Sequence, residues 1–472
     1  MPRGTRRRSA STAVVVLLGA ALTALAVGTA SAASTAAGAL VPAPPGVPVV
    51  VLPATDLATP SAPPVAAPAL EAALAKALTS KALGTDVTVS VLDVASGAAL
   101  VSRGDTRPQQ PASSLKLLTA VTVLHDFGDD ATLATRVVTG ATPGQIVLVG
   151  GGDATLTRVP APSRALLDGQ AARPASMTAL ASATAAALRA QGRTSVTLRV
   201  DDTLFTGPRT AEGWPASYVA TGVVSPVSAL SVDSGRTSAT SSSRDADPAM
   251  AAAAFFARRL AAAGITVTGT VSRGSAPASA TVLAEVRSPT MADLVERMLT
   301  RSDDDLAEAL AHLAGGKSGG SASFLGGVAA TTGVLSALGI PIDGVSLVDG
   351  SGLSRTDHVP AITMVRTLAL AATDEATTGQ SAGVLWPTTS GLPVAGVTGT
   401  LTDRFAAPGT SAGRGVVRAK TGTLTGVNSL SGLVRDREGR LLAFSFIADG
   451  SPGPVAEARA ALDRAATVLA AS

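Results

Sequence analysis

Two short lysine-containing sequences, Ser113-Ser114-Leu115-Lys116 and Lys420-Thr421-Gly422-Thr423, decide how this chain folds and what it can do. The chain has only five lysines, so two of the five fall within these tetrapeptides. On a helix, residues three positions apart lie on one face, which brings the Ser113 hydroxyl within reach of the Lys116 amine. A hydroxyl beside an amine is the arrangement of a nucleophile with its base. The first tetrapeptide therefore predicts covalent catalysis through Ser113.

A third short sequence adds to this prediction. A serine and a lysine at this spacing often occur by chance, but serine acyltransferases with both tetrapeptides also carry Ser-x-Asn between them, on a loop of a helical region. The candidate in this chain is Ser302-Asp303-Asp304, in which an aspartate takes the place of the asparagine. No other segment can supply the amide, because the only asparagine is Asn428. Ser302 and Asp304 therefore join the candidate site.

Composition excludes several other classes of protein. A chain of 472 residues, 46% hydrophobic and 15% charged, is globular and long enough for about two or three domains. Aromatic residues make up only 2%, too few for the stacked rings that bind nucleic acid. The absence of cysteine excludes disulfides, thiol nucleophiles and cysteine-ligated metals. The three histidines, His125, His312 and His358, lack a metal-binding spacing, so we expect no metal and no cofactor.

Residues 1–32 have the pattern of a secretory signal peptide. Four arginines precede an apolar run from Ala13 to Val27 and the small residues Ala30-Ser31-Ala32. The alternative is an uncleaved membrane anchor, although the apolar run is shorter than the ~20 residues that a spanning helix needs. We therefore expect an exported protein that acts outside the cytoplasm, in the cell envelope or secreted. The four arginines of this segment exceed the formal net charge of +3, so the chain without them is no longer basic. The basic balance therefore does not indicate nucleic-acid binding.

Residues 33–68 are rich in alanine and proline, which is typical of an extended linker. Such a tether could hold the domain that follows it near a membrane or thread it into a wall layer. Peripheral membrane or wall association is thus one interpretation of this segment, and simple disorder is the other.

Longer blocks around the short sequences identify a family. Three of them are Gly150-Gly151-Gly152-Asp153, Asp349-Gly350-Ser351-Gly352-Leu353-Ser354 and Leu392-Pro393-Val394-Ala395-Gly396. With the two tetrapeptides, these blocks resemble those of the class C low-molecular-mass penicillin-binding proteins, the D-alanyl-D-alanine carboxypeptidase/endopeptidase family (peptidase family S13). The resemblance covers residues 69–470. We interpret residues 349–354 as a structural turn at the edge of the site.

The resemblance implies an α/β fold. Its core would be a penicillin-binding protein transpeptidase-like domain, similar to serine β-lactamases, in which helices flank an antiparallel sheet. We expect residues 69–130 and 289–472 to form this catalytic domain. The long separation between Lys116 and Ser302 implies an insertion, which we place at residues 131–288 and expect to be mainly β.

The resemblance also implies a role for each site residue. Ser113 would attack the carbonyl of the penultimate D-alanine of a peptidoglycan stem peptide, Lys116 would take its proton, and Ser302 would relay that proton to the leaving amine. Backbone amides of Ser113 and Thr423 would form the oxyanion hole. Penicillins and other β-lactams would acylate the same serine. The residues expected to bind the substrate and its terminal carboxylate are Asp304, Lys420, Thr421, Gly422 and Thr423.

Asp304 raises a question about the base. An asparagine could donate and accept hydrogen bonds between the two lysines, whereas an ionised aspartate only accepts. A carboxylate ~4 Å from Lys116 would favour the protonated amine by a few kcal/mol at an effective dielectric near 20. Either Asp304 stays neutral in a dry site, or the enzyme is slow. We expect activity to persist at a reduced level.

Two other functions stay open at this stage. A serine β-lactamase would share the nucleophile but would release its acyl group fast, and no Glu-x-x-x-Asn segment is available for that step. A wall-binding homologue would keep the fold and lose the chemistry, and Asp304 is the main support for this alternative. Stable, transient or absent acylation of Ser113 by a penicillin distinguishes the peptidase from these two alternatives.

Overall fold

The computed structural model describes residues 67–160, 173–373 and 383–472. The predicted signal peptide (1–32) lies outside the described residues, and so does almost all of the predicted linker (33–68). The first described element is helix α1 (Ala67–Ala77), whose Leu70 and Leu74 are buried. The limits of the catalytic domain and of the insertion stay predictions.

The main sheet joins the two ends of the chain. It is antiparallel throughout, in the order β11-β12-β13-β1-β2. Strand β1 pairs with β13 from Val87 opposite Ala448 to Asp93 opposite Leu442. The N-terminal and C-terminal segments therefore fold as one unit. The strands are β1 (Val87–Asp93), β2 (Ala99–Arg103), β11 (Arg418–Leu424), β12 (Val427–Arg435) and β13 (Leu441–Asp449).

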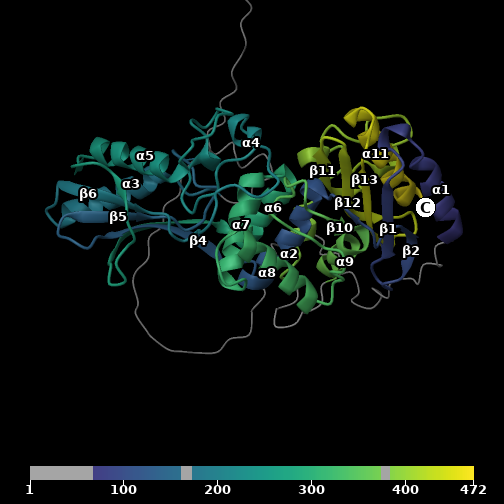
Figure 1. The fold of residues 1–472 in the computed structure, drawn as a ribbon, viewed down its shortest axis with the longest axis horizontal. Helices are drawn as coiled ribbons and strands as arrows, with labels where there is room; N and C mark the ends of the chain where they lie inside the picture. The colour runs from purple at the N-terminus through teal and green to yellow at the C-terminus, as the bar shows by residue number, and fades with distance from the viewer. Residues whose placement is uncertain (1–66, 161–172, 374–382) are drawn as a thin grey trace, which may run out of the picture. The chain divides into compact units, whose positions relative to one another are not determined.

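Helices cover both faces of this sheet (Figure 1). Helix α1 and the C-terminal helix α11 (Val455–Ala471) pack on one face, and α9 (Ala361–Ala372) packs on the other. Strands β12 and β13 are consequently buried along nearly their whole length. A strand covered on both faces has no polar side to present to water, which explains its continuous run of apolar and small residues.

A layer of helices continues from the α9 face and carries two of the three short sequences. Helix α2 (Lys116–Phe127) is buried from Lys116 to Leu124 and contacts α6, α7, α8 and α9. Their shared core includes Leu117, Val121 and Leu310. The other members of this layer are α6 (Met291–Arg301), α7 (Asp304–Lys317) and α8 (Phe324–Ala337).

Apolar residues recur at helical spacing from Met291 to Leu313, and the structure divides this stretch into α6 and α7. Ser302 adopts a left-handed conformation (φ 55°), which ends α6, and its N–H bonds to the carbonyl of Met298. The side chain of Asp303 then accepts from the N–H of Leu306 and caps α7. The break places the Ser302 and Asp304 side chains at adjoining helix ends.

A second sheet is formed by residues 132–290. Its order is β7-β6-β5-β4-β9, with β8 beside β6, and its pairings are antiparallel at β4 and parallel at β6. Two alanine-rich helices pack on this sheet, α3 (Met177–Ala190) and α5 (Pro248–Ala262). The strands are β4 (Thr132–Thr139), β5 (Gln145–Val149), β6 (Ser195–Asp201), β7 (Thr266–Val267), β8 (Ser272–Arg273) and β9 (Val282–Thr290).

Short elements complete the described chain. Strands β3 (Pro108–Gln109) and β10 (Val359–Pro360) pair with each other. Two single-turn helices are α4 (Ser217–Ala220) and α10 (Pro387–Ser390). The 3-10 turns are η1 (Lys81–Leu83), η2 (Ala112–Leu115), η4 (Asp233–Gly235), η5 (Gly399–Leu401) and η6 (Ser411–Gly413).

Gly432 on β12 allows β11 to lie close beside it. A Cβ at this position would meet the carbonyl oxygen of Arg418 at 2.1 Å and the Cα of Ala419 at 2.6 Å. We expect Gly432→Ala to lower the free energy of unfolding by about 1–3 kcal/mol, because added volume in a packed core forces the backbone apart. Urea unfolding measures this change.

The matched control is Gly333→Ala on α8, where a Cβ would meet no atom within 4 Å. It should stabilise the helix by about 0.5–1 kcal/mol. Equal stability of the two variants would contradict the close packing of β11 on β12.

Candidate active site

Ser113 and Lys116 lie side by side at the start of α2. Ser113 belongs to the η2 turn, Lys116 is the first residue of the helix, and their Oγ and Nζ atoms are 3.1 Å apart. Ser113 is half-buried, whereas the Lys116 side chain has no exposed surface. The serine is thus the accessible member of the pair. The structure brings together the two residues that the first tetrapeptide predicts.

Two glycines let the rest of the protein approach this turn. A Cβ on Gly352 would lie 2.0 Å from the carbonyl oxygen of Ala112, and one on Gly422 would lie 2.6 Å from the carbonyl oxygen of Pro111. Ala112 itself has a positive φ of 48°, which is unusual for a residue with a side chain. Gly422 of the second tetrapeptide therefore acts by leaving room for the turn that holds Ser113.

The amine of Lys116 meets three oxygen atoms. Besides Ser113 Oγ, they are Asp304 Oδ1 at 2.5 Å and the backbone carbonyl of Ser351 at 2.7 Å. A carboxylate and a carbonyl can only accept hydrogen bonds, so they take two N–H groups of the amine. The third position faces Ser113, whose hydroxyl can donate as well as accept. A neutral amine in this geometry would direct its lone pair at the Ser113 hydroxyl and could take its proton.

Asp304 is the first residue of α7, and one of its oxygens accepts the hydrogen bond that an asparagine oxygen could accept. Its Oδ1 accepts from Lys116, as the oxygen of an asparagine could. Its side chain is about four-fifths buried, with 19% exposed. Burial raises the pKa of the Asp304 carboxyl above its usual range, and the positive charge of Lys116 opposes the shift.

Lys420 and Ser302 form the second lysine–serine pair. Lys420 Nζ donates to Ser302 Oγ at 2.8 Å and to the carbonyl of Thr421 at 2.8 Å. The left-handed turn between α6 and α7 holds Ser302 in this position. Burial, together with the positive charge of Lys116, holds the pKa of Lys420 well below its usual range, and Asp304 opposes that shift. A negatively charged group bound here would restore the charge on Lys420.

Thr421 and Thr423 alternate with Lys420 along the edge strand β11. The Thr421 hydroxyl pairs with that of Thr400 in η5 at 2.9 Å. Arg459 of α11 donates to Thr423 Oγ1 at 3.4 Å. Side chains alternate on a strand, so these hydroxyls and the Lys420 amine leave opposite faces of β11.

The turn at residues 349–354 lies deeper in the site than the sequence suggests. It supplies the Ser351 carbonyl to Lys116 and is held by the carboxylate of Asp349. That carboxylate accepts four hydrogen bonds: from the N–H groups of Ser351 (3.0 Å), Gly352 (2.6 Å) and Ser354 (2.7 Å), and from the indole of Trp214 (2.7 Å). An aspartate followed by glycine and serine is the signal that could have located it.

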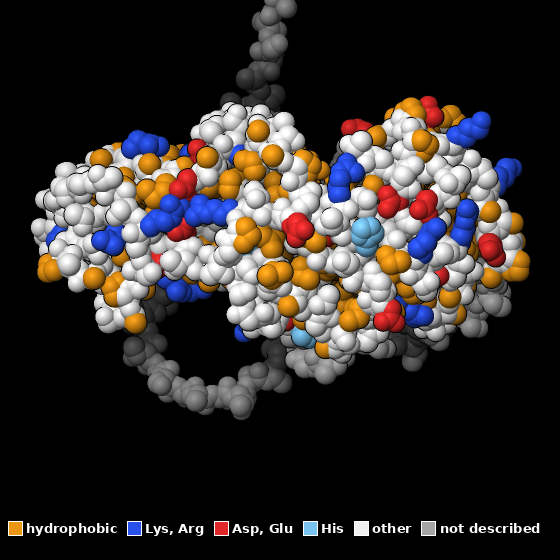
Figure 2. Space-filling model, in the orientation of Figure 1, with side chains coloured by type: hydrophobic (Ala, Val, Ile, Leu, Met, Phe, Trp, Pro, Cys, Tyr) orange, Lys and Arg blue, Asp and Glu red, His pale blue; other side chains and the backbone are white. Residues whose placement is uncertain are grey.

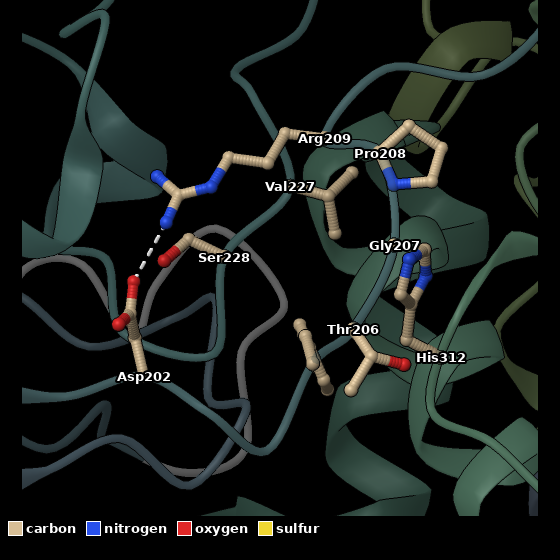
Figure 3. A pocket seen from close by; sticks show the side chains of 9 residues that line it. Asp202, Thr206, Gly207, Pro208, Arg209, Val227, Ser228 and His312 are labelled. Carbon is tan, nitrogen blue, oxygen red and sulfur yellow. Dashed lines mark hydrogen bonds and ion pairs between the residues drawn. The ribbon is translucent and has the colours of Figure 1, made fainter. Parts of the chain in front are cut away.

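Residues of 131–288 also contact the site from behind. Figure 3 shows His312, on α7, directed toward the loop that carries Thr206 and Gly207. The ring of His312 lies 5.0 Å from that of Phe205 and 4.6 Å from that of Phe324. Burial lowers the pKa of His312 to about 4, so the ring is neutral at physiological pH. His312 is a packing residue, as its spacing suggests.

Neither a metal centre nor a charged surface of one sign marks a different site. The described ranges contain no group of three or more His, Cys, Asp or Glu side chains that could hold a metal ion. Figure 2 shows basic and acidic side chains intermixed on the face that it draws. A metal-free reaction stays a prediction from the sequence.

Comparisons with known proteins agree with this geometry. The family model described as D-Ala-D-Ala carboxypeptidase 3 (S13) matches residues 70–246 and 237–470. The chain is 37% identical over 481 residues to the Carboxypeptidase DacB of Mycolicibacterium smegmatis, covering 99% of this chain and 98% of that protein. It is 31% identical to the D-alanyl-D-alanine carboxypeptidase of an Actinomadura species, over 78% of each chain.

The fold is similar to that of a solved structure, penicillin binding protein 4 (dacB) from Haemophilus influenzae. The TM-score is 0.67 at 23% identity, and the match covers 84% of this chain and 97% of that one. At this identity the likeness supports the fold alone, which is the α/β, transpeptidase-like architecture that the sequence predicts.

Replacing Asp304 by asparagine tests whether its charge restrains Lys116. Because Asn cannot ionise, Asp304→Asn removes a carboxylate that would hold a proton on the amine as pH rises. We expect the variant to be acylated by a labelled penicillin about tenfold faster at neutral pH, since one pKa unit corresponds to a tenfold change in a protonation equilibrium. Rates measured from pH 5 to 9 should show the acid limb at lower pH in the variant.

Asp303→Asn is the matched control. It removes a neighbouring carboxylate that does not contact Lys116, and asparagine caps a helix as well as aspartate does. Identical pH profiles for Asp304→Asn and the parent protein would show that the charge of Asp304 has no influence on the base.

Proposed function

This chain belongs to the D-Ala-D-Ala carboxypeptidase 3 (S13) family, and we propose that Ser113 is the nucleophile of the serine-type D-Ala-D-Ala carboxypeptidase reaction that it catalyses. One observation supports this assignment above the others. A fully buried lysine amine lies 3.1 Å from the hydroxyl of a half-buried serine. The substrate class is the peptidoglycan stem peptide that ends in D-Ala-D-Ala.

Acylation transfers one proton and forms one ester. Ser113 Oγ attacks the carbonyl carbon of the penultimate D-alanine while its proton passes to Lys116 Nζ. The tetrahedral oxyanion is stabilised by the backbone amides of Ser113 and Thr423. The C–N bond then breaks, and the proton reaches the leaving amine through the Ser302 hydroxyl. The products are free D-alanine and an ester on Ser113.

Deacylation returns the enzyme to its starting state. A water molecule attacks the ester carbonyl, gives one proton to the Lys116 amine and forms the second tetrahedral intermediate. Collapse of this intermediate returns the proton to Ser113 and releases the shortened peptide. Lys116 is thus the base in both half-reactions, which requires a neutral amine before each attack.

Lys420 is suited to hold the terminal carboxylate of the substrate. It is buried beside Ser302, and its lowered pKa rises again when an anion binds. Thr421 and Thr423 leave the opposite face of the same edge strand, so their hydroxyls reach that carboxylate only if the substrate lies along the edge of β11, where the Lys420 amine bonds to the Thr421 carbonyl. Endopeptidase action on D-alanyl cross-links would use the same residues, with a second stem peptide as the leaving group.

The alternatives differ in the fate of the acyl group. A β-lactamase would hydrolyse the ester quickly, and a wall-binding homologue would form none. The alignment of Ser113 with Lys116 favours a chemically active site over a binding protein.

The protein is proposed to act outside the cytoplasmic membrane, where its substrate lies. The arginines and apolar run of residues 1–32 support export, and the proline-rich residues 33–68 support a tether at the envelope. Within the described ranges, no helix is both long and apolar enough to span a bilayer.

Labelling with a penicillin tests the nucleophile. We expect residues 33–472 to gain the mass of one penicillin on the peptide that contains Ser113. This label should last longer than one turnover of a D-Ala-D-Ala peptide. Ser113→Ala should take no label, whereas Ser114→Ala, one residue away, should still take it at Ser113. Transient labelling would indicate a β-lactamase, and an unlabelled parent protein would contradict the proposed function.

Replacing Lys420 tests the carboxylate site. Lys420→Gln removes a charged hydrogen-bond donor, so KM for a D-Ala-D-Ala peptide should rise about tenfold to a hundredfold. For the parent, KM should increase as pH rises through the lowered pKa of Lys420, because the amine loses its charge there. That pH dependence should be absent from the variant.

A peptide with a terminal carboxamide is the matched substrate, and Lys317→Gln the matched variant. The carboxamide should bind parent and Lys420→Gln alike, and Lys317→Gln should behave as the parent does. Equal losses for the carboxylate and carboxamide peptides would exclude Lys420 as the carboxylate ligand.

A further inference from the structure

Glu308 is a fully buried acid one helical turn behind Asp304. Residues 304, 308 and 312 are four positions apart on α7, so they lie along one face of the helix. Glu308 has no exposed surface, and its Oε2 accepts from the backbone N–H of Gly350 at 3.1 Å.

Glu308 thereby holds the peptide segment that binds Lys116. Gly350 and Ser351 are consecutive: the first donates to Glu308, and the carbonyl of the second accepts from Lys116 at 2.7 Å. The carbonyl of Gly350 also accepts from Thr119 on α2 at 2.6 Å. This short segment is therefore bonded to α7 on one side and to α2 on the other.

The packing leaves this segment little freedom to move. A Cβ on Gly350 would lie 2.4 Å from the Cβ of Ala311 and 3.2 Å from the carbonyl oxygen of Ala307, so the backbone lies directly on α7. The hydrogen bond from Gly350 N–H to Glu308 Oε2 joins this backbone to the helix. Removing the acceptor would let the Ser351 carbonyl turn away from Lys116.

The charges around Glu308 favour its neutral form. Burial and the negative charge of Asp349 raise the pKa of Glu308 well above its usual range, and hydrogen bonds from Ser351 and Gly350, with the charge of Lys116, oppose this shift. Asp357 is also buried near Asp349, and its pKa is raised for the same reasons. On α7 itself, Asp304 and the neutral His312 complete the titratable groups along this face.

A fully buried acid is costly, because its carboxyl group loses its contact with water. An apolar side chain of the same length would avoid that cost, so stability alone does not account for Glu308. What the acid supplies is an acceptor at the distance of Gly350 N–H.

We propose that Glu308 is a positioning residue of acyl transfer, which fixes the Gly350–Ser351 peptide and, through the Ser351 carbonyl, the amine of Lys116 beside Ser113. The inference rests on the proposed function of Ser113 and Lys116. It assigns Glu308 no contact with substrate. The hydrogen-bond acceptor is what matters, so glutamine can replace the acid.

Three variants distinguish a role of Glu308 as a hydrogen-bond acceptor from a role of its charge. Glu308→Gln keeps a neutral acceptor at the same reach. Glu308→Met removes the acceptor. Glu308→Asp keeps a carboxyl group, but its side chain is one methylene shorter and the carboxyl group lies farther from Gly350 N–H. Leu260→Ala is the control, because it opens a cavity in the core around α5, remote from the Gly350–Ser351 peptide.

The measurement is the acylation of Ser113 by a labelled penicillin from pH 5 to 9, with thermal unfolding recorded for each variant. We expect Glu308→Met and Glu308→Asp to be acylated on the order of tenfold to a hundredfold more slowly, the usual result of a misplaced catalytic group. The affinity of the initial non-covalent complex should not change. Glu308→Gln should stay within about threefold of the parent with the same pH profile, and Leu260→Ala should be acylated normally below its unfolding temperature.

Two outcomes would overturn the inference while leaving the proposed function intact. One is normal acylation of both Glu308→Met and Glu308→Asp, which would make Glu308 a packing residue. The other is an equal loss in Glu308→Gln, which would make the ionisable proton the important feature. A parent protein that takes no label at Ser113 would overturn the proposed function, and this inference with it.

Discussion

The structure depends on burying the amine of Lys116 in a place with no access to water. A buried cation without partners costs several kcal/mol, so the fold must bring oxygens to it. It does so from three separate segments: the η2 turn with Ser113, the start of α7 with Asp304, and the turn that contains Ser351. These segments lie far apart in the sequence. Their convergence on one nitrogen atom explains why the described part of the chain must fold around α2.

A second buried lysine makes the balance of charge more demanding. Lys116 and Lys420 are both without exposed surface, and the charge of the first lowers the pKa of the second. Asp304 is the acid that acts electrostatically on both lysines, and burial raises its own pKa. Burial thus disfavours the charged form of both Asp304 and Lys420. An asparagine would leave the two lysines to compete for protons without any anion. With aspartate, a proton can lie either on Asp304 or on a lysine. Substrate binding at Lys420 can change which of these groups carries it.

The sequence predicted those parts of the site that depend on local spacing. The contact of Ser113 with Lys116 follows from three positions on a helix, and the fold class follows from the blocks that resemble a family. Contacts between residues far apart in the sequence leave no such local pattern. Nothing in the residues around Glu308 indicates that its carboxyl group meets the N–H of Gly350. The left-handed φ of Ser302 has no local signal either, because apolar residues continue at helical spacing across it.

Contacts from residues 131–288 make this segment a part of the site wall. Trp214 donates to Asp349, the residue that shapes the turn bound to Lys116. Arg244 pairs with Asp305 at 3.0 Å, one position after Asp304 on α7. Burial raises the pKa of Asp305 to about 7, and the attraction of Arg244 opposes that shift. Loss of the segment would therefore remove the ion pair between Arg244 and Asp305 and the hydrogen bond from Trp214 to Asp349. A chain shortened to the two outer segments would keep the catalytic tetrapeptides and lose the supports that align them.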